Sequence, residues 1–280
     1  CQFQNVLESE EFKKEAKIMS KLKHQNIVEF IGISDNKLIM EYIELGCIRD
    51  YMKDRKKKNN LLPVLDILKI LSDVATGMAY LASERILHCD LAARNVLLTK
   101  DLRAKISDFG LSKILGEKDY YKGSGHKSLP AWWCSPEALQ YRRFTSSADI
   151  WSFGVVMWEA FTHCESPKLC SDVTKLVVHL NDGRRLKKPP QCPDKAYELM
   201  RDCWKFEYKE RPDFPTVEKR CRELEYMHKQ EKAKENENSA NQNPERGSKN
   251  SDASSGQSER SSQRSSESHS QSESGIIMSH

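Results

Sequence analysis

Two stretches decide the fold of this chain: HCDLAARN at residues 88–95 and, thirteen residues later, DFG at residues 108–110. They bring together two carboxylates and one amide. Asp90 can accept the proton of a hydroxyl group, while Asn95 and Asp108 can hold a magnesium ion against the phosphates of a nucleotide. The spacing of these three side chains therefore predicts phosphoryl-transfer chemistry.

The composition allows one globular domain or two small lobes. The chain has 280 residues, of which 38% are hydrophobic and 31% are charged, enough apolar material for a packed core. The 45 basic and 41 acidic residues nearly balance, so a nucleic-acid partner is not expected. The basic run at residues 53–58 is interpreted as a solvated loop.

Cysteine use and hydropathy indicate a reducing, cytoplasmic location. The nine cysteines are odd in number and lack metal-ligand spacing, which favours free thiols. The most apolar stretch, residues 150–161, is too short to cross a bilayer and contains Ser152, Gly154 and Glu159. We therefore predict a buried helix there and no direct membrane insertion.

Hydrophobic periodicity divides the rest of the chain. Helical spacing appears at residues 10–22 and 65–82, and short β-type runs appear at 27–33, 37–42, 96–98 and 104–106. From residue 229 to 280 the sequence is rich in Ser, Glu and Gln and almost without apolar residues. Such a segment is expected to be disordered. The pattern is that of an α+β protein with a tail.

A series of motifs extends this prediction to a family. In order along the chain lie EAKIM at 15–19, HQNI at 24–27, the two stretches quoted above, SPE at 135–137, DIWSFG at 149–154 and RPDF at 211–214. From about residue 10 to 227 this order resembles a protein-tyrosine kinase catalytic domain. The resemblance implies a bilobal protein-kinase-like fold with a mostly helical large lobe at 43–228. It also implies an incomplete small lobe at 1–42, made of the helix with Glu15 and the last strands only.

The resemblance assigns roles to the residues around the first motif. Asp90 matches the catalytic base, and Asn95 and Asp108 match the magnesium ligands. Ala92 and Arg94 follow the tyrosine-kinase pattern, because serine/threonine kinases typically place Lys two residues after the catalytic Asp. The implied cofactors are ATP and Mg²⁺, and the implied partners are proteins with a substrate tyrosine.

Nucleotide-binding positions follow in the same way. Met40 resembles the gatekeeper, Glu41 and Ile43 belong to the hinge that holds adenine, and Leu97 would lie beneath the ring. Glu15 resembles the helix glutamate that pairs with a lysine near the phosphates. For Met40 and Leu97, ordinary core packing is an alternative that does not exclude the functional one.

Further positions bear on regulation and stability. Tyr120 and Tyr121 look like activation-loop phosphorylation sites, although two exposed loop tyrosines would give the same pattern. The tyrosine pair resembles Syk-type cytoplasmic families and the Trp133-Cys134 pair resembles the Ack type, so the subfamily stays open. By the same resemblance, Glu137 and Arg211 are expected to form a buried ion pair.

Three departures from the family pattern are visible. The chain has no glycine-rich loop and no lysine in a VAIK motif, so we expect it to begin inside the small lobe and to be poorly active alone. Cys89 stands where the family has an Arg that meets the activation-loop phosphate, so we expect loop phosphorylation to matter less. Trp132 stands where many tyrosine kinases have a basic residue.

The sequence thus predicts an intracellular signalling protein-tyrosine kinase domain that transfers the ATP γ-phosphoryl group to protein tyrosines. The alternative is a pseudokinase, a kinase-shaped scaffold or binding module without catalysis. Asp90, Asn95 and Asp108 favour the enzyme, whereas Cys89 and the missing phosphate-binding elements favour the scaffold. An interaction protein that acts through its Ser-rich tail has compositional support only.

Overall fold

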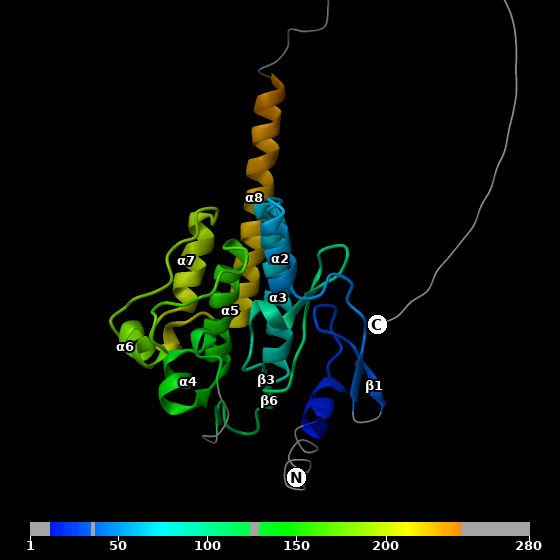
Figure 1. The fold of residues 1–280 in the computed structure, drawn as a ribbon, viewed down its shortest axis with the longest axis vertical. Coiled ribbons are helices and arrows are strands. Elements are labelled where there is room, and N and C mark those ends of the chain that lie inside the picture. Colours follow the sequence, from blue (N-terminus) through cyan, green and yellow to red (C-terminus); the bar gives the residue numbers. More distant parts are fainter. Residues whose placement is uncertain (1–11, 35–36, 124–128, 242–280) are drawn as a thin grey trace, which may run out of the picture. The chain divides into compact units, whose positions relative to one another are not determined.

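A computed structural model describes residues 12–34, 37–123 and 129–241. The chain separates into two units, residues 1–236 and 237–280. Nearly all the described elements lie in the first unit, and Figure 1 follows them from the blue helix at residues 12–19 to the orange end of the last helix. The fold is a mixture of helices and small antiparallel sheets and is mostly helical, which agrees with the predicted α+β class.

The labelled helices and 3₁₀ turns cover much of the chain after residue 47. The helices are α2 (Ile48–Lys57), α3 (Val64–Ser83), α4 (Pro136–Tyr141), α5 (Ser146–Phe161), α6 (Leu176–Asn181), α7 (Asp194–Cys203) and α8 (Phe214–Asn241). The 3₁₀ turns are Ala93–Asn95, Ala131–Trp133, Val173–Lys175 and Tyr208–Glu210.

Every labelled strand belongs to a two-stranded antiparallel sheet. The pairs are β1 (Phe30–Ser34) with β2 (Lys37–Met40), β3 (Ile86–Leu87) with β6 (Lys113–Ile114), β4 (Val96–Leu98) with β5 (Ala104–Ile106), and β7 (Tyr121–Lys122) with β8 (Arg143–Phe144). The predicted strands at 96–98 and 104–106 are confirmed. The predicted turn between β1 and β2 contains residues 35–36, which lie outside the described residues.

Helix α5 lies at the centre of the large helical region. It packs against α3 and α7, and Figure 1 shows it between them. Thr145 caps its start by accepting a hydrogen bond from the backbone N–H of Ala148, which satisfies one of the free donors of the first turn. All its residues from Ala148 to Phe161 are buried, so the predicted buried helix is confirmed.

The HQNI stretch ties the start of the chain to β5. The buried side-chain amide of Asn26 donates to the carbonyl of Ala104 at 3.0 Å, and the backbone of Asn26 accepts from Ile106 N–H at 2.9 Å. Gly77 of α3 approaches so closely that an added Cβ would lie 2.9 Å from Asn26 O. These contacts fix β5, and with it the position of Asp108 two residues later.

Two boundaries differ from those predicted. The basic run at 53–58 is not a loop, because residues 53–57 belong to α2, which buries Ile48 and Met52 one turn apart on its inner face. Helix α8 continues to Asn241, past residue 228, where the predicted large lobe ends. Residues 229–235, KQEKAKE, are exposed, are good helix formers and contain a Lys232–Glu235 pair, so they can extend a helix without burial.

Glu137 and Arg211 form the predicted buried ion pair. The guanidinium donates to both carboxylate oxygens, at 2.7 and 2.9 Å, and the side chain of Arg211 is 0% exposed. Arg211 also donates to three backbone carbonyls, of Lys205, Ser147 and Phe206. The pair therefore joins α4 to the chain between α7 and α8.

Replacing Arg211→Ala should lower the free energy of unfolding by roughly 3–5 kcal/mol, because it leaves a buried carboxylate without its partner. Thermal or urea unfolding measures the effect. Arg222→Ala is the matched control, since the Arg222 side chain is 62% exposed in its pair with Glu218 on α8 and the pair should contribute about 0–1 kcal/mol. Overlapping melting curves for Arg211→Ala and the parent would contradict the role of the pair.

Candidate active site

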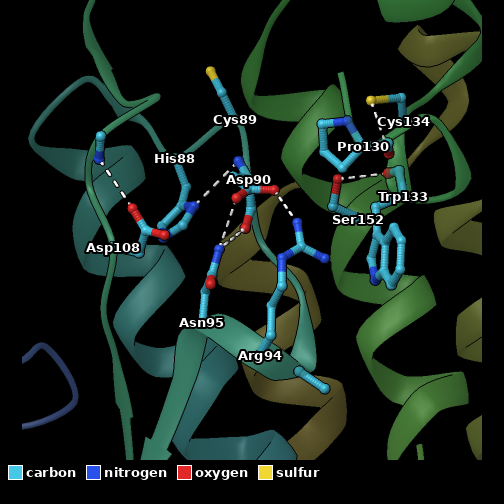
Figure 2. Close-up of polar contacts among 12 residues, drawn as sticks. His88, Cys89, Asp90, Arg94, Asn95, Asp108, Pro130, Trp133, Cys134 and Ser152 are labelled. Carbon is cyan, nitrogen blue, oxygen red and sulfur yellow. Dashed lines mark hydrogen bonds and ion pairs between the residues drawn. The ribbon is translucent and has the colours of Figure 1, made fainter. Parts of the chain in front are cut away.

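Residues 88–95 form a loop between β3 and β4 that places Asp90 among hydrogen-bond donors. The amide of Asn95 donates to both the backbone carbonyl and the carboxylate of Asp90, each at 2.8 Å. Arg94 forms an ion pair with the other carboxylate oxygen. Figure 2 shows these contacts converging on Asp90. The three predicted residues Asp90, Arg94 and Asn95 are thus brought together.

The carboxylate of Asp90 is largely but not wholly buried. Its side chain is 13% exposed. Burial raises the pKa of Asp90, against the lowering effects of Arg94 and Asn95. A carboxylate in this environment has one face open to a second molecule and a greater affinity for a proton than a free aspartate, which suits a general base.

Asp149 of α5 holds the backbone of this loop. Its two carboxylate oxygens accept hydrogen bonds from the N–H groups of His88 at 2.8 Å and of Cys89 at 2.9 Å. Cys89 has φ of +64°, a left-handed conformation that is strained for a residue with a side chain. Burial raises the pKa of Asp149, and His88 and the two backbone bonds oppose the shift. The carboxylate therefore stabilises a loop conformation that the sequence alone disfavours.

Two further polar residues of α5 hold the end of the loop and the segment beside it. One oxygen of Glu159 accepts from the backbone N–H of Ala93 and from the indole N–H of Trp133, both at 2.9 Å. Ser152 donates to the carbonyl of Trp133 at 2.8 Å, as Figure 2 shows. The guanidinium of Arg94 lies 4.7 Å from the Trp133 ring centroid, so Arg94 is held between Trp133 and Asp90.

Asp108 follows β5 and is exposed. It has φ of +63°, and one carboxylate oxygen accepts from the N–H of Gly110 at 3.3 Å. The preceding Ser107 carbonyl lies 3.1 Å from the His88 ring nitrogen, and the rings of His88 and Phe109 are 5.3 Å apart. His88 thus joins the loop at 88–95, which carries Asp90 and Asn95, to the segment that carries Asp108.

The donor set fits a magnesium ion shared with a nucleotide. Asp108 offers an exposed carboxylate and Asn95 an amide oxygen, and Mg²⁺ commonly takes one or two protein oxygens plus waters and phosphates. Over the described parts of the chain, no group of three or more His, Cys, Asp or Glu forms an all-protein metal cage. The residues therefore suit a metal brought with phosphates.

Glu15 lies close to Asp108. Burial raises the pKa of Glu15, the charge of Asp108 raises it further, and hydrogen bonding with the backbone of Phe109 opposes both. Within the described residues no basic side chain forms an ion pair with Glu15. The helix at 12–19 thus directs a carboxylate toward Asp108 where the resemblance predicts a lysine partner.

The predicted adenine-binding residues lie on neighbouring segments. Met40 ends β2 and is 40% exposed, and Ile43 is buried. The segment at 45–47 runs along β4 through backbone hydrogen bonds with Leu98, beside half-buried Leu97. The carboxylate of Glu41 pairs with Lys105, so any contact of Glu41 with adenine falls to its backbone.

Tyr120 and Tyr121 lie at the start of β7, outside the hydrogen-bonded site described above. Tyr120 is half-buried, with the guanidinium of Arg143 4.4 Å from its ring centroid. The Tyr121 ring lies 6.3 Å from that of Phe144 and 5.4 Å from the Lys113 amine. The two tyrosines are thus packed against β8 and basic side chains, and are not freely exposed.

Comparison with known proteins shows the family to which the chain belongs. The family model described as protein tyrosine and serine/threonine kinase matches residues 2–221. This chain belongs to that kinase family. Tyrosine-protein kinase ZAP-70 of Mus musculus is 40% identical over 223 residues, covering 78% of this chain and 36% of the relative.

Two further relatives show the breadth of the likeness. Tyrosine-protein kinase SYK of Gallus gallus is 38% identical over 221 residues (78% of this chain, 35% of the relative). The NT-3 growth factor receptor of Gallus gallus is 34% identical over 225 residues (75% and 27%). The chain spans about a third of the length of the ZAP-70 and SYK relatives. It is a tyrosine kinase catalytic domain similar to both, and the predicted Syk-type resemblance is confirmed.

Sequence reasoning about this kinase domain missed Glu159 and Arg143. Glu159 entered only as a polar residue that argues against a membrane span, yet a lone Glu in an otherwise apolar helix signals a buried hydrogen-bond acceptor. No described helix is long and apolar enough to cross a membrane. Arg143 gave no signal, because its partner Tyr120 becomes its neighbour only through the pairing of β7 with β8.

Replacing Glu159→Ala should destabilise the kinase domain and loosen residues 93 and 133, since two buried donors lose their acceptor at about 1–3 kcal/mol each. Glu159→Gln keeps an acceptor oxygen in place and should lose much less. Unfolding curves and amide hydrogen exchange at Ala93 measure the two effects. Equal stability of Glu159→Ala and the parent would show that these hydrogen bonds do not hold the loop.

Proposed function

We propose that this domain transfers the γ-phosphoryl group of ATP to the hydroxyl of a tyrosine in a protein substrate. The observation that carries the proposal is the environment of Asp90, a partly exposed carboxylate held by Arg94 and Asn95. Its raised pKa, caused by burial, suits proton acceptance from a hydroxyl.

The reaction needs positioning more than covalent chemistry. Asp90 orients the substrate hydroxyl and accepts its proton as the new oxygen–phosphorus bond forms and the bond to ADP breaks. Asn95 keeps the Asp90 carboxylate in place and, with Asp108, would hold Mg²⁺. When bound, that ion neutralises charge on the phosphates.

Membership of the kinase family implies the use of ATP. We infer that Met40, Glu41, Ile43 and Leu97 surround the adenine ring. Hydrogen bonds from the backbone at 41–43 would give orientation, and the apolar side chains would give contact area. Glu15 lies beside Asp108, at the end of the site where the phosphates would bind. Because Glu15, Asp108 and the phosphates are all negative, a cation is needed there.

Arg94 and Ala92 support tyrosine as the acceptor. Arg94 is fixed by Asp90 and by the ring of Trp133, and Ala92 is fully buried, so no side chain at 92 reaches toward the substrate as lysine would. The longer reach of a tyrosine hydroxyl matches this arrangement.

The remaining assignments follow from the family. We infer a bilobal domain in which residues 1–42 belong to the small lobe, residues 43–228 form the large lobe and the segment from 229 is an appended tail. Cytoplasmic signalling through protein substrates is consistent with the ZAP-70 and SYK relatives. The nearly balanced charge offers no support for a nucleic-acid partner.

A pseudokinase is the second candidate, and one observation favours it. The carboxylate of Glu15 lies by Asp108 and, among the residues that the structure describes, forms no ion pair with a basic side chain. A domain in which no cation pairs with that carboxylate would bind nucleotide weakly and act as a scaffold. The two candidates differ in a measurable way.

Replacing Asp90→Asn should reduce phosphate incorporation into a tyrosine peptide by roughly 10²–10⁴-fold, the range for loss of a general base. The assay uses the 280-residue chain, or a longer form of the protein that contains it, with Mg-ATP. Thermal shift by Mg-ATP should persist in Asp90→Asn, because the base does not hold the nucleotide. A serine peptide of the same sequence is the substrate control.

Two outcomes separate the candidates. Incorporation that depends on Asp90 supports the enzyme. A parent protein that is stabilised by Mg-ATP but never phosphorylates tyrosine would contradict the enzyme and favour the scaffold.

A further inference from the structure

Arg143 of β8 occupies an unusual position beside the activation-loop tyrosines. Its guanidinium carbon lies 4.4 Å from the Tyr120 ring centroid and 5.4 Å from that of Tyr208. Its Nε is buried and has no hydrogen-bond partner. Among the described residues no carboxylate pairs with Arg143. A guanidinium with a buried, unused donor is costly, and it is suited to an acceptor that arrives later.

The surroundings of Tyr120 are basic. Lys122 lies opposite Arg143 in the β7–β8 ladder, and the amine of Lys118 lies 5.9 Å from the Tyr120 ring centroid. The nearest acidic neighbour in the sequence, Asp119, pairs with Arg85 at 3.1 Å. The charge near Tyr120 is therefore mostly positive, as an incoming phosphate requires.

Cys89 cannot supply this charge. Its side chain packs with an apolar cluster that includes Leu87, Phe144 and Tyr121, and burial raises the pKa of its thiol well above the usual value. The thiol is thus neutral where the family pattern has an arginine. A phosphate on the loop needs another cation, and Arg143 already lies over the tyrosine ring.

We propose that Arg143 is the phosphate-binding residue for phosphotyrosine at position 120, in place of the arginine that Cys89 replaces. The proposal rests on the proposed function only in taking Tyr120 as a kinase substrate. In that reaction the Tyr120 oxygen gains the γ-phosphoryl group of ATP, ADP leaves, and the hydroxyl proton passes to the base of the phosphorylating kinase.

The position of Arg143 explains how it could bind the phosphate and what that binding would do to the loop. An arginine can lie over an aromatic ring and still donate from its N–H groups to a phosphate at the ring's edge. Because Arg143 is paired with β7 and lies near Tyr208, binding the phosphate would hold residues 120–122 against β8 and against the 3₁₀ turn Tyr208–Glu210. That would steady residues 129–134, which follow in the chain and contact Arg94 through Trp133.

The test measures the phosphate directly. A Tyr121→Phe chain, phosphorylated at Tyr120 by an added active tyrosine kinase with ATP, is titrated by ³¹P NMR. An aryl phosphate has a second pKa of about 6, and a contacting guanidinium should lower it by roughly 0.5–1. Arg143→Gln should restore the ordinary value. Arg142→Gln, which removes the same charge from the adjacent residue, should restore it far less.

Several results would decide the matter. Arg143→Lys keeps the charge without the planar fork, so it should fall between the parent and Arg143→Gln, and it replaces Arg143→Gln if that variant fails to fold. Identical titrations for the parent and both Arg143 variants would overturn the proposal, as would equal effects of Arg142→Gln and Arg143→Gln. Because the phosphate is installed by another enzyme, an inactive domain would still give a readable result.

Discussion

The buried carboxylate of Asp149 is the interaction on which the site depends. It accepts the backbone N–H groups of two consecutive loop residues, His88 and Cys89. Without this acceptor, two buried donors would be left unpaired and Cys89 would have no compensation for its left-handed backbone. Asp90 is the next residue, so the direction in which the proposed base points is set one peptide earlier, by a helix.

Helix α5 extends this principle along its length. Asp149, Ser152 and Glu159 are buried polar residues in an otherwise apolar helix, and each contacts the loop at 88–95 or the segment at 131–133. Burying such groups is unfavourable unless every one is hydrogen-bonded. The hydrogen bonds that they form offset this cost and also hold the backbone next to Asp90, Arg94 and Trp133. The site's geometry is thus set by the fold itself, which is the preorganisation that the proposed reaction needs.

The sequence was informative where a single pattern determines a structure. The apolar helix at α5 and the strands at β4 and β5 could be predicted from hydrophobic periodicity, and the Glu137–Arg211 pair was implied by the resemblance to the kinase family. Helix α2 could not, because the charges at 53–58 outweigh the two buried residues, Ile48 and Met52, that anchor it. The length of α8 was missed because residues 229–237 are exposed and carry no apolar periodicity that would mark a helix.

The candidate-site residues divide in the same way, into those that lie in short sequence motifs and those whose partners are distant in the sequence. Asp90, Asn95 and Asp108 lie in short motifs, so their meeting could be foreseen from spacing. Glu159 and Arg143 act on residues far away in the chain, and only the packing of α5 and the pairing of β7 with β8 bring them there. Long-range partners of this kind are not encoded in any local pattern.

The most direct test of this account is amide hydrogen exchange at His88 and Cys89 in the parent and in Asp149→Ala, with Ser152→Ala as the matched change on α5. We predict that Asp149→Ala greatly accelerates exchange at both amides, while Ser152→Ala leaves them protected. Unchanged protection of His88 and Cys89 in a folded Asp149→Ala protein would contradict the claim that this carboxylate holds the loop.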